Sequence, residues 1–150
     1  MLKVGDKAPQ FTLVDQDENQ VSLSDYSNQK VVIWFFPKAS TPGWTNQGIG
    51  FRVELDKFKK LNIAIIGVSA DPPKRQKKFV EKYDFNYPML RDESHEMLES
   101  YGVWGLKKFM GREYMGISRV TYILDENHNI ESVFEKVNTK SHACDILDIL

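Results

Sequence analysis

The sequence has only one cysteine, Cys144, among its 150 residues. A single thiol excludes a disulfide within the chain and any zinc cluster made of cysteines. Long apolar runs are also missing, because none approaches the ~18 residues that suggest a membrane span. The first residues contain no apolar segment of the kind found in signal peptides. The sequence therefore predicts a protein of the cytoplasm that makes no contact with a membrane.

An excess of charge of either sign is absent as well. The formal net charge is -1, so the chain as a whole has no electrostatic attraction for nucleic acid, and we expect no nucleic-acid partner. Residues 74–78 form a basic run that is typical of a solvated helix face. A better candidate for a protein-partner surface combines basic and aromatic residues, namely Lys107, Lys108 and Arg112 with Trp104, Phe109 and Tyr114.

Size and composition favour one folded unit. Apolar residues make up 41% of the chain and aromatic residues 12%, which supports a real hydrophobic core. A chain of this length buries roughly 68–70% of its unfolded surface. We find no repeat, linker or low-complexity segment, and we predict a single domain over residues 1–150.

The most informative stretch is residues 31–52. Its first six residues, Val31 to Phe36, are all apolar and end at Pro37, which predicts a central strand buried on both faces. After a short polar loop, Thr41 and Pro42 suit the N-cap and the first position of a helix. A buried strand that leads into a helix N-terminus creates a pocket that favours anions.

The remaining elements follow from apolar spacing and turn residues. Phe51, Leu55 and Phe58 share one face of a helix that continues to about Leu61. We further predict strands at 11–14, 21–23, 63–69, 87–90, 119–125 and 130–136, a helical turn at 24–26, helices at 71–82, 93–101 and from Ser141 to the end, and a loop at 103–116. This order predicts an α/β sandwich in which helices flank a mixed central sheet.

Several short motifs carry a family resemblance. They are Gly5 to Pro9 with Phe11 to Leu13, Val21 to Asp25, Phe36 to Lys38, Thr41 to Gly43, Phe51 with Arg52, Gly67 to Asp71, and the long stretch from Tyr101 to Ile117. As a set they resemble the peroxiredoxins, specifically the peroxiredoxin Q or bacterioferritin comigratory protein branch. The resemblance covers nearly the whole chain and implies a thioredoxin-like fold.

The resemblance also implies a chemistry and a set of site residues. Active relatives reduce hydrogen peroxide and organic hydroperoxides with a peroxidatic cysteine, and thioredoxin returns the electrons. The family's active-site pattern falls on Pro37, Thr41, Trp44 and Arg119 of this sequence, and the resolving position falls on Ile49. Relatives in this branch are often monomers, so a monomer or a weak dimer is expected. We expect no cofactor.

Both redox cysteine positions depart from the family pattern. A thiolate is the species that attacks, and the Trp44 indole is donor-only and has no nucleophile at neutral pH. An indole also has roughly 150–250 Å² to bury, so we expect it to fill the space of the peroxide. We therefore predict an inactive pseudo-peroxidase with a binding or regulatory role. The alternative is a working thioredoxin-dependent thiol peroxidase that acts by another route, such as Cys144.

Two site candidates have more than one interpretation. Arg119 suits a clamp for an anion or peroxide, an edge-strand partner for a surface carboxylate, or a cation–π partner for Trp44. Thr41 is an N-cap in either the active or the inactive interpretation. Cys144 lies at the margin of the last helix's apolar face, which suits a small boundary residue or, alternatively, a regulatory thiol.

The three histidines do not predict a metal site. His95 lies among Asp92, Glu93 and Glu96, but acidic residues in the first turn of a helix are ordinary partners of its dipole. His128 falls in a turn and His142 near the start of the last helix, and neither has an evident set of partners. We expect no metal ion.

Overall fold

The computed structural model describes residues 3–15, 17–26, 28–35, 56–69, 77, 81, 89–92, 95–109, 111–117 and 120–134. For 106–109 and 112–117 it describes the backbone only. The predicted N-cap at Thr41, the glycine-rich start of its helix and the last helix from Ser141 lie outside the described residues.

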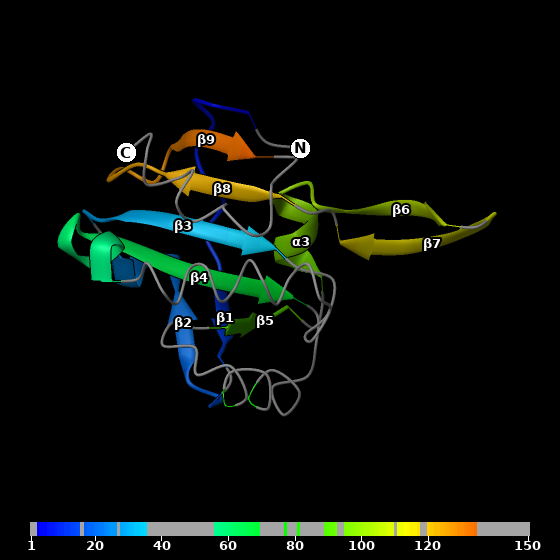
Figure 1. Cartoon of the computed structure of the whole chain (residues 1–150), viewed down its shortest axis with the longest axis horizontal. Helices are drawn as coiled ribbons and strands as arrows, with labels where there is room; N and C mark the ends of the chain where they lie inside the picture. Colours follow the sequence, from blue (N-terminus) through cyan, green and yellow to red (C-terminus); the bar gives the residue numbers. More distant parts are fainter. Residues whose placement is uncertain are drawn as a thin grey trace.

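Seven strands form one mixed sheet (Figure 1). In spatial order they are β2 (Gln20–Ser22), β1 (Thr12–Val14), β5 (Met89–Arg91), β4 (Ile63–Ser69), β3 (Lys30–Phe35), β8 (Thr121–Leu124) and β9 (Ile130–Phe134). The pairs β3–β4 and β4–β5 are parallel, and the other pairs in the sheet are antiparallel. The predicted mixed central sheet is confirmed.

Strand β3 is the centre of the sheet. It pairs with β4 on one side and with β8 on the other, and Val31 to Phe35 are all fully buried. An unbroken apolar run is what a strand covered on both faces requires, because alternate side chains point to opposite faces. The prediction made from the apolar run at Val31 is thereby confirmed for its described residues.

One face of the sheet packs against an aromatic core. Val31, Ile33 and Phe35 belong to the same cluster as Tyr101 and Tyr122. The Tyr101 and Tyr122 ring centroids are 5.6 Å apart at an interplanar angle of 62°, and Phe35 lies 5.7 Å from Tyr101. Edge-on and tilted ring pairs of this kind add to the energy of area burial. The cluster joins β3 and β8 to the chain that follows the short helix α3 (Glu96–Ser100).

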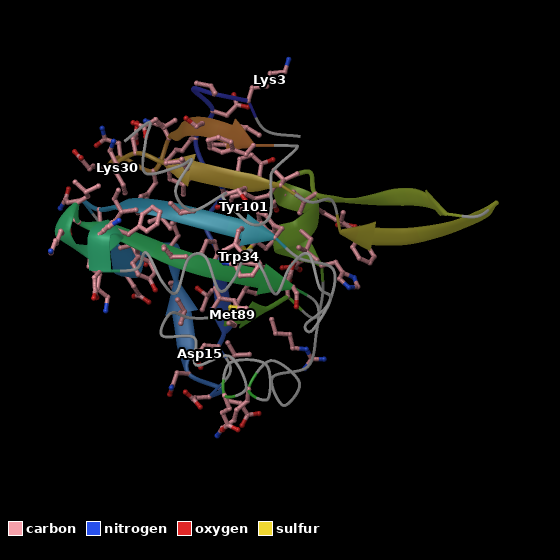
Figure 2. The ribbon with its side chains drawn as sticks, in the orientation of Figure 1. Lys3, Asp15, Lys30, Trp34, Met89 and Tyr101 are labelled. Atoms are coloured by element: carbon pink, nitrogen blue, oxygen red, sulfur yellow. The ribbon has the colours of Figure 1, made fainter. Side chains whose placement is uncertain are left out.

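The opposite face of β3 holds a second buried group. Trp34 is fully buried, and it pairs in register with Gly67 of β4, which in turn pairs with Met89 of β5. A Cβ atom on Gly67 would lie 2.7 Å from the Met89 Sδ atom and 3.1 Å from the Trp34 Nε1 atom. Figure 2 labels Trp34 and Met89. The glycine therefore leaves room for two large side chains on its neighbouring strands.

We expect Gly67→Ala to lower the free energy of unfolding by about 1–3 kcal/mol, because the added methyl group overpacks this site. Shortening the neighbour in Gly67→Ala/Met89→Val should recover part of the loss. Gly105→Ala is the matched control, since nothing lies within 4 Å of its new Cβ. Urea unfolding measures all three variants. An equal change in Gly67→Ala and Gly105→Ala would contradict the steric explanation.

The predicted helix at 93–101 begins later than expected. Its N-cap is His95, whose φ of 64° and ψ of 13° are left-handed, so the helix starts at Glu96. The Asp92 carboxylate Oδ2 accepts the Leu98 N–H at 2.8 Å and so satisfies a free donor of the first turn. Met97 and Leu98 are buried, and Gly102 follows the helix with a φ of 69°.

The predicted loop at 103–116 is wrong. This stretch is an antiparallel hairpin of β6 (Trp104–Phe109) and β7 (Arg112–Ile117), paired from Trp104↔Ile117 to Phe109↔Arg112. Gly111 lies in the turn at a φ of 78°, a conformation that glycine adopts without strain. The hairpin forms its own two-stranded sheet and extends away from the seven-stranded sheet (Figure 1).

The other predictions agree with the structure where it describes them. Strands β1 and β2 match the strands predicted at 11–14 and 21–23 and pair as a hairpin, and the predicted helical turn is a 3-10 turn at Leu23–Tyr26. Residues 56–60 are helical and Phe58 is fully buried. Strand β5 ends one residue later than expected, at Arg91, whereas β8 starts only at Thr121.

In the described part of the chain, no helix has the length and apolar character needed to span a membrane.

His128 makes a contact that its position in the sequence does not predict. It lies in the turn between β8 and β9, as expected, but it is buried and its Nε2–H donates to the Tyr26 carbonyl oxygen at 2.9 Å. The sequence does not indicate this hydrogen bond, because Tyr26 lies 102 positions away in the chain. This histidine ties the β8–β9 turn to the 3-10 turn.

Candidate functional site

The carboxyl ends of the three parallel strands meet at one edge of the sheet. Strand β3 ends at Phe35, β4 at Ser69 and β5 at Arg91. In Figure 1 the arrowheads of β3 and β4 point the same way, toward α3. Ligands of open α/β sheets bind outside the carboxyl ends of such strands, so this edge is the candidate site.

Strand β8 brings a second part of the chain to this edge. It runs antiparallel to β3, so its first residue, Thr121, pairs with Trp34 near the end of β3. Just before it, the Val120 carbonyl oxygen accepts the Phe35 N–H at 3.0 Å. Phe35 precedes Pro37 by two positions and Val120 directly follows Arg119. The described chain thus joins the two segments that lead to these predicted site residues.

Buried polar side chains line the same edge. Ser69 and Asp92 are fully buried and Thr121 nearly so. The Asp92 N–H donates to the Ser69 carbonyl oxygen at 2.8 Å, while its carboxylate accepts the Leu98 N–H. Polar groups at this depth are costly unless they are hydrogen-bonded. These bonds fix the start of α3 to the ends of β4 and β5.

The base of the β6–β7 hairpin is held beside this edge. The rings of His95 and Trp104 stack with their centroids 4.1 Å apart and an interplanar angle of 10°. Both side chains are half-buried. The contact connects the residue that caps α3 to the first residue of β6, and it determines where the hairpin leaves the body of the protein.

None of the site residues predicted from the sequence is among the described residues. Pro37, Thr41, Trp44, Ile49, Arg119 and Cys144 all lie outside them, so their roles stay predictions. Within the described ranges, no three His, Cys, Asp or Glu side chains gather to hold a metal ion.

The sequence patterns do not predict the buried polar residues of this edge. Ser69 belongs to a family motif without an assigned role, and the acidic residues around His95 suggest Asp92 only as a partner of a helix dipole. A signal is present in the sequence, because Ser69 is the last residue of the buried strand β4 and Asp92 directly follows β5. A polar residue at the carboxyl end of a parallel strand is typical of the edge where such sheets bind ligands.

Comparison with known sequences gives a consistent family. A model of the AhpC/TSA family matches residues 4–133. Peroxiredoxin Bcp of Escherichia coli (strain K12) is 44% identical over 149 residues, which are 99% of this chain and 96% of the relative. Peroxiredoxin Bcp of Bacillus subtilis (strain 168) is 38% identical over 149 residues, 99% of this chain and 94% of that protein.

Solved structures agree with the sequence matches, and they confirm the predicted thioredoxin-like α/β sandwich. The bacterioferritin comigratory protein of Xanthomonas campestris, studied for its alkyl peroxide reduction activity, superposes with a TM-score of 0.87 at 30% identity, covering 93% of this chain and 88% of the other. A cysteine-to-serine mutant of Xylella fastidiosa PrxQ gives a TM-score of 0.93 at 28% identity and covers 99% of this chain and 95% of its own.

Proposed function

The chain belongs to the AhpC/TSA family, and on that premise we propose that it is a binding or regulatory protein derived from a peroxiredoxin, without thiol peroxidase activity of its own. The observation that carries the proposal is the cysteine count. The chain has one cysteine, Cys144, and the positions that the family uses for redox chemistry hold Trp44 and Ile49.

The proposal rests on the chemistry of the missing group. Peroxide reduction begins with a thiolate that attacks one peroxide oxygen and becomes a sulfenic acid. An indole has no acidic group in the physiological range and only a ring N–H to donate. Trp44 therefore supplies neither the nucleophile nor the electrons. Ile49 likewise cannot form the disulfide that would let thioredoxin complete the cycle.

The rest of the family's site is retained in the sequence. Pro37, Thr41 and Arg119 keep the family's residue types. The hydrogen bond between Phe35 and Val120 supports a shared location for the segments that carry Pro37 and Arg119. We propose that Arg119 and the helix start at Thr41 favour a small anion, or that the chain associates with an active relative.

The second candidate function is a thiol peroxidase that acts through Cys144. The observation in its favour is that relatives matching 99% of this chain are named peroxiredoxins. Peroxide and thioredoxin would then be the substrate and the electron donor, as in the family. Cys144 carries the only sulfur in the chain that can react in this way.

A peroxide-consumption assay separates the two candidates. We expect the wild-type chain, with dithiothreitol or thioredoxin as reductant, to consume hydrogen peroxide and an organic hydroperoxide no faster than the Cys144→Ser variant does. Peroxiredoxin Bcp of Escherichia coli serves as the positive control. Activity in the wild-type chain that disappears in Cys144→Ser would establish the second candidate instead.

We propose the following organisation for the protein. Residues 1–150 form one thioredoxin-like domain that works in the cytoplasm as a monomer or a weak dimer. The supporting observation is that the family match starts at residue 4 and extends to residue 133 without a break. The net charge of -1 supports a protein or small-molecule partner over a nucleic acid.

A further inference from the structure

The β6–β7 hairpin is a feature that the proposed function leaves unexplained. It is a separate two-stranded sheet, and within the described ranges neither of its strands pairs with a third. An isolated two-stranded hairpin is marginally stable in water, and its outer edges present unpaired N–H and C=O groups. Such an edge is a template for another extended segment.

The charge of the hairpin is concentrated on β6. Lys107 and Lys108 give this strand a formal charge of +2, whereas Arg112 and Glu113 cancel on β7. In the register, Lys108 lies opposite Glu113, but Lys107 lies opposite Tyr114 and has no acidic cross-strand partner. The remaining chain carries -3, so the hairpin is a basic projection on a mildly acidic protein.

The hairpin also contains residue types that are enriched at protein interfaces. Trp104 and Phe109 are the first and last residues of β6, and Arg112 and Tyr114 lie on β7. Tyrosine, tryptophan and arginine are the usual sources of binding energy in protein–protein contacts. The stack of Trp104 on His95 fixes the base of β6, so part of the entropy cost of ordering the strand is met before a partner binds.

We propose that the outer edge of β6 binds an extended acidic segment of another protein, which adds to the hairpin as a third strand. Main-chain hydrogen bonds supply the pairing, and carboxylates of the segment face Lys107 and Lys108. The occupant is not the β6 edge of a second copy, because that pairing would bring lysines of both copies together.

The probe is a short blocked peptide with two adjacent glutamates between valines, titrated into the 15N-labelled full chain. Adjacent strand positions lie on opposite faces, as Lys107 and Lys108 do, so the two glutamates supply one carboxylate to each face. We expect chemical-shift changes and slowed amide exchange at residues 104–109, and an affinity that falls as salt rises. Lys107→Gln/Lys108→Gln should weaken binding at least about fivefold, since it removes two charged contacts. Lys59→Gln/Lys60→Gln, which changes two exposed helix lysines, should leave the affinity unchanged within about twofold.

Four results would overturn the proposal. One is an unchanged spectrum at residues 104–109, which would leave the lysines only the function of blocking edge-to-edge aggregation. Another is an equal response to the same peptide with lysine in place of glutamate. A third is tighter binding of a single-stranded oligonucleotide than of the acidic peptide. The fourth is self-association of the peptide-free chain in sedimentation, abolished by Lys107→Gln/Lys108→Gln, which would assign the edge to a second copy.

Discussion

Replacing Trp44 with cysteine is expected to give this chain a peroxide-reactive thiol. The substitution returns a nucleophile to the position that follows Pro37 and Thr41 in the family pattern. A helix N-terminus and a nearby guanidinium both lower the pKa of a thiol and so raise the thiolate fraction. We expect the new thiol to react with hydrogen peroxide at least ~10²-fold faster than Cys144, which is the scale of one well-placed polar donor in a reaction site.

The measurement is the rate of sulfenic acid formation at residue 44, followed by mass spectrometry after trapping. The double variant Trp44→Cys/Cys144→Ser isolates the new thiol, and Trp44→Ser in place of cysteine serves as the matched control of similar size. Turnover should need dithiothreitol, because Ile49 offers no resolving thiol. If residue 44 reacted no faster than Cys144 does in the wild-type chain, the pocket would have lost more than its nucleophile.

Reactivity at residue 44 depends on the fold around it, and the sequence predicts the central strands of that fold well. The run from Val31 to Phe35 predicts a strand buried on both faces, and the structure places it between β4 and β8 with every side chain buried. The prediction succeeds because a short run of β-branched and aromatic residues that ends at a proline favours a buried strand over a helix. Strand β4 follows by the same argument, and together they determine the edge at which the site lies.

The hairpin shows where the local pattern is insufficient. Gly105, Gly111 and Gly116 suggest a loop, and so does the proximity of charged to aromatic residues. In the structure Gly105 pairs with Gly116 across the ladder, and only Gly111 lies in the turn. Cross-strand pairing therefore overrides the low strand propensity of glycine. The pairing of two strands depends on both of them and is not predicted by the sequence of either strand alone.

The sequence does not predict the start of α3 or the hydrogen bond made by His128, and the reason is related. His95 adopts a left-handed conformation because the chain turns there between Asp92 and the helix, a geometry that the acidic residues around it do not reveal. His128 finds its acceptor at Tyr26. Both depend on contacts that close only in the folded chain. The candidate site divides in the same way, since motifs predict which residues belong to it, whereas Ser69 and Asp92 emerge only from the structure.

The fully buried Tyr101 gives the second large effect, on stability. Its hydroxyl donates to the Pro9 carbonyl oxygen at 2.8 Å, and its own carbonyl oxygen accepts the Tyr122 hydroxyl at 2.5 Å. The ring also lies 6.4 Å from Phe11. Tyr101→Ala should lower the free energy of unfolding by about 3–5 kcal/mol through the cavity it leaves. Tyr101→Phe should cost only about 1–2 kcal/mol, because it removes a hydrogen bond and keeps the ring.

The free energy of unfolding should also depend on pH, and the phenylalanine variant tests this. Burial, and to a lesser extent the neighbouring Tyr122, raises the pKa of Tyr101 above its usual value of 10.0. Above that pH the unfolded chain loses the phenolic proton while the folded chain keeps it, so the stability contribution present at neutral pH declines by about 1 kcal/mol per pH unit. Tyr101→Phe lacks this decline. Guanidinium unfolding from pH 7 to 12 should therefore show wild type and variant converging above pH 10, and parallel curves would contradict a buried, protonated phenol at the centre of this core.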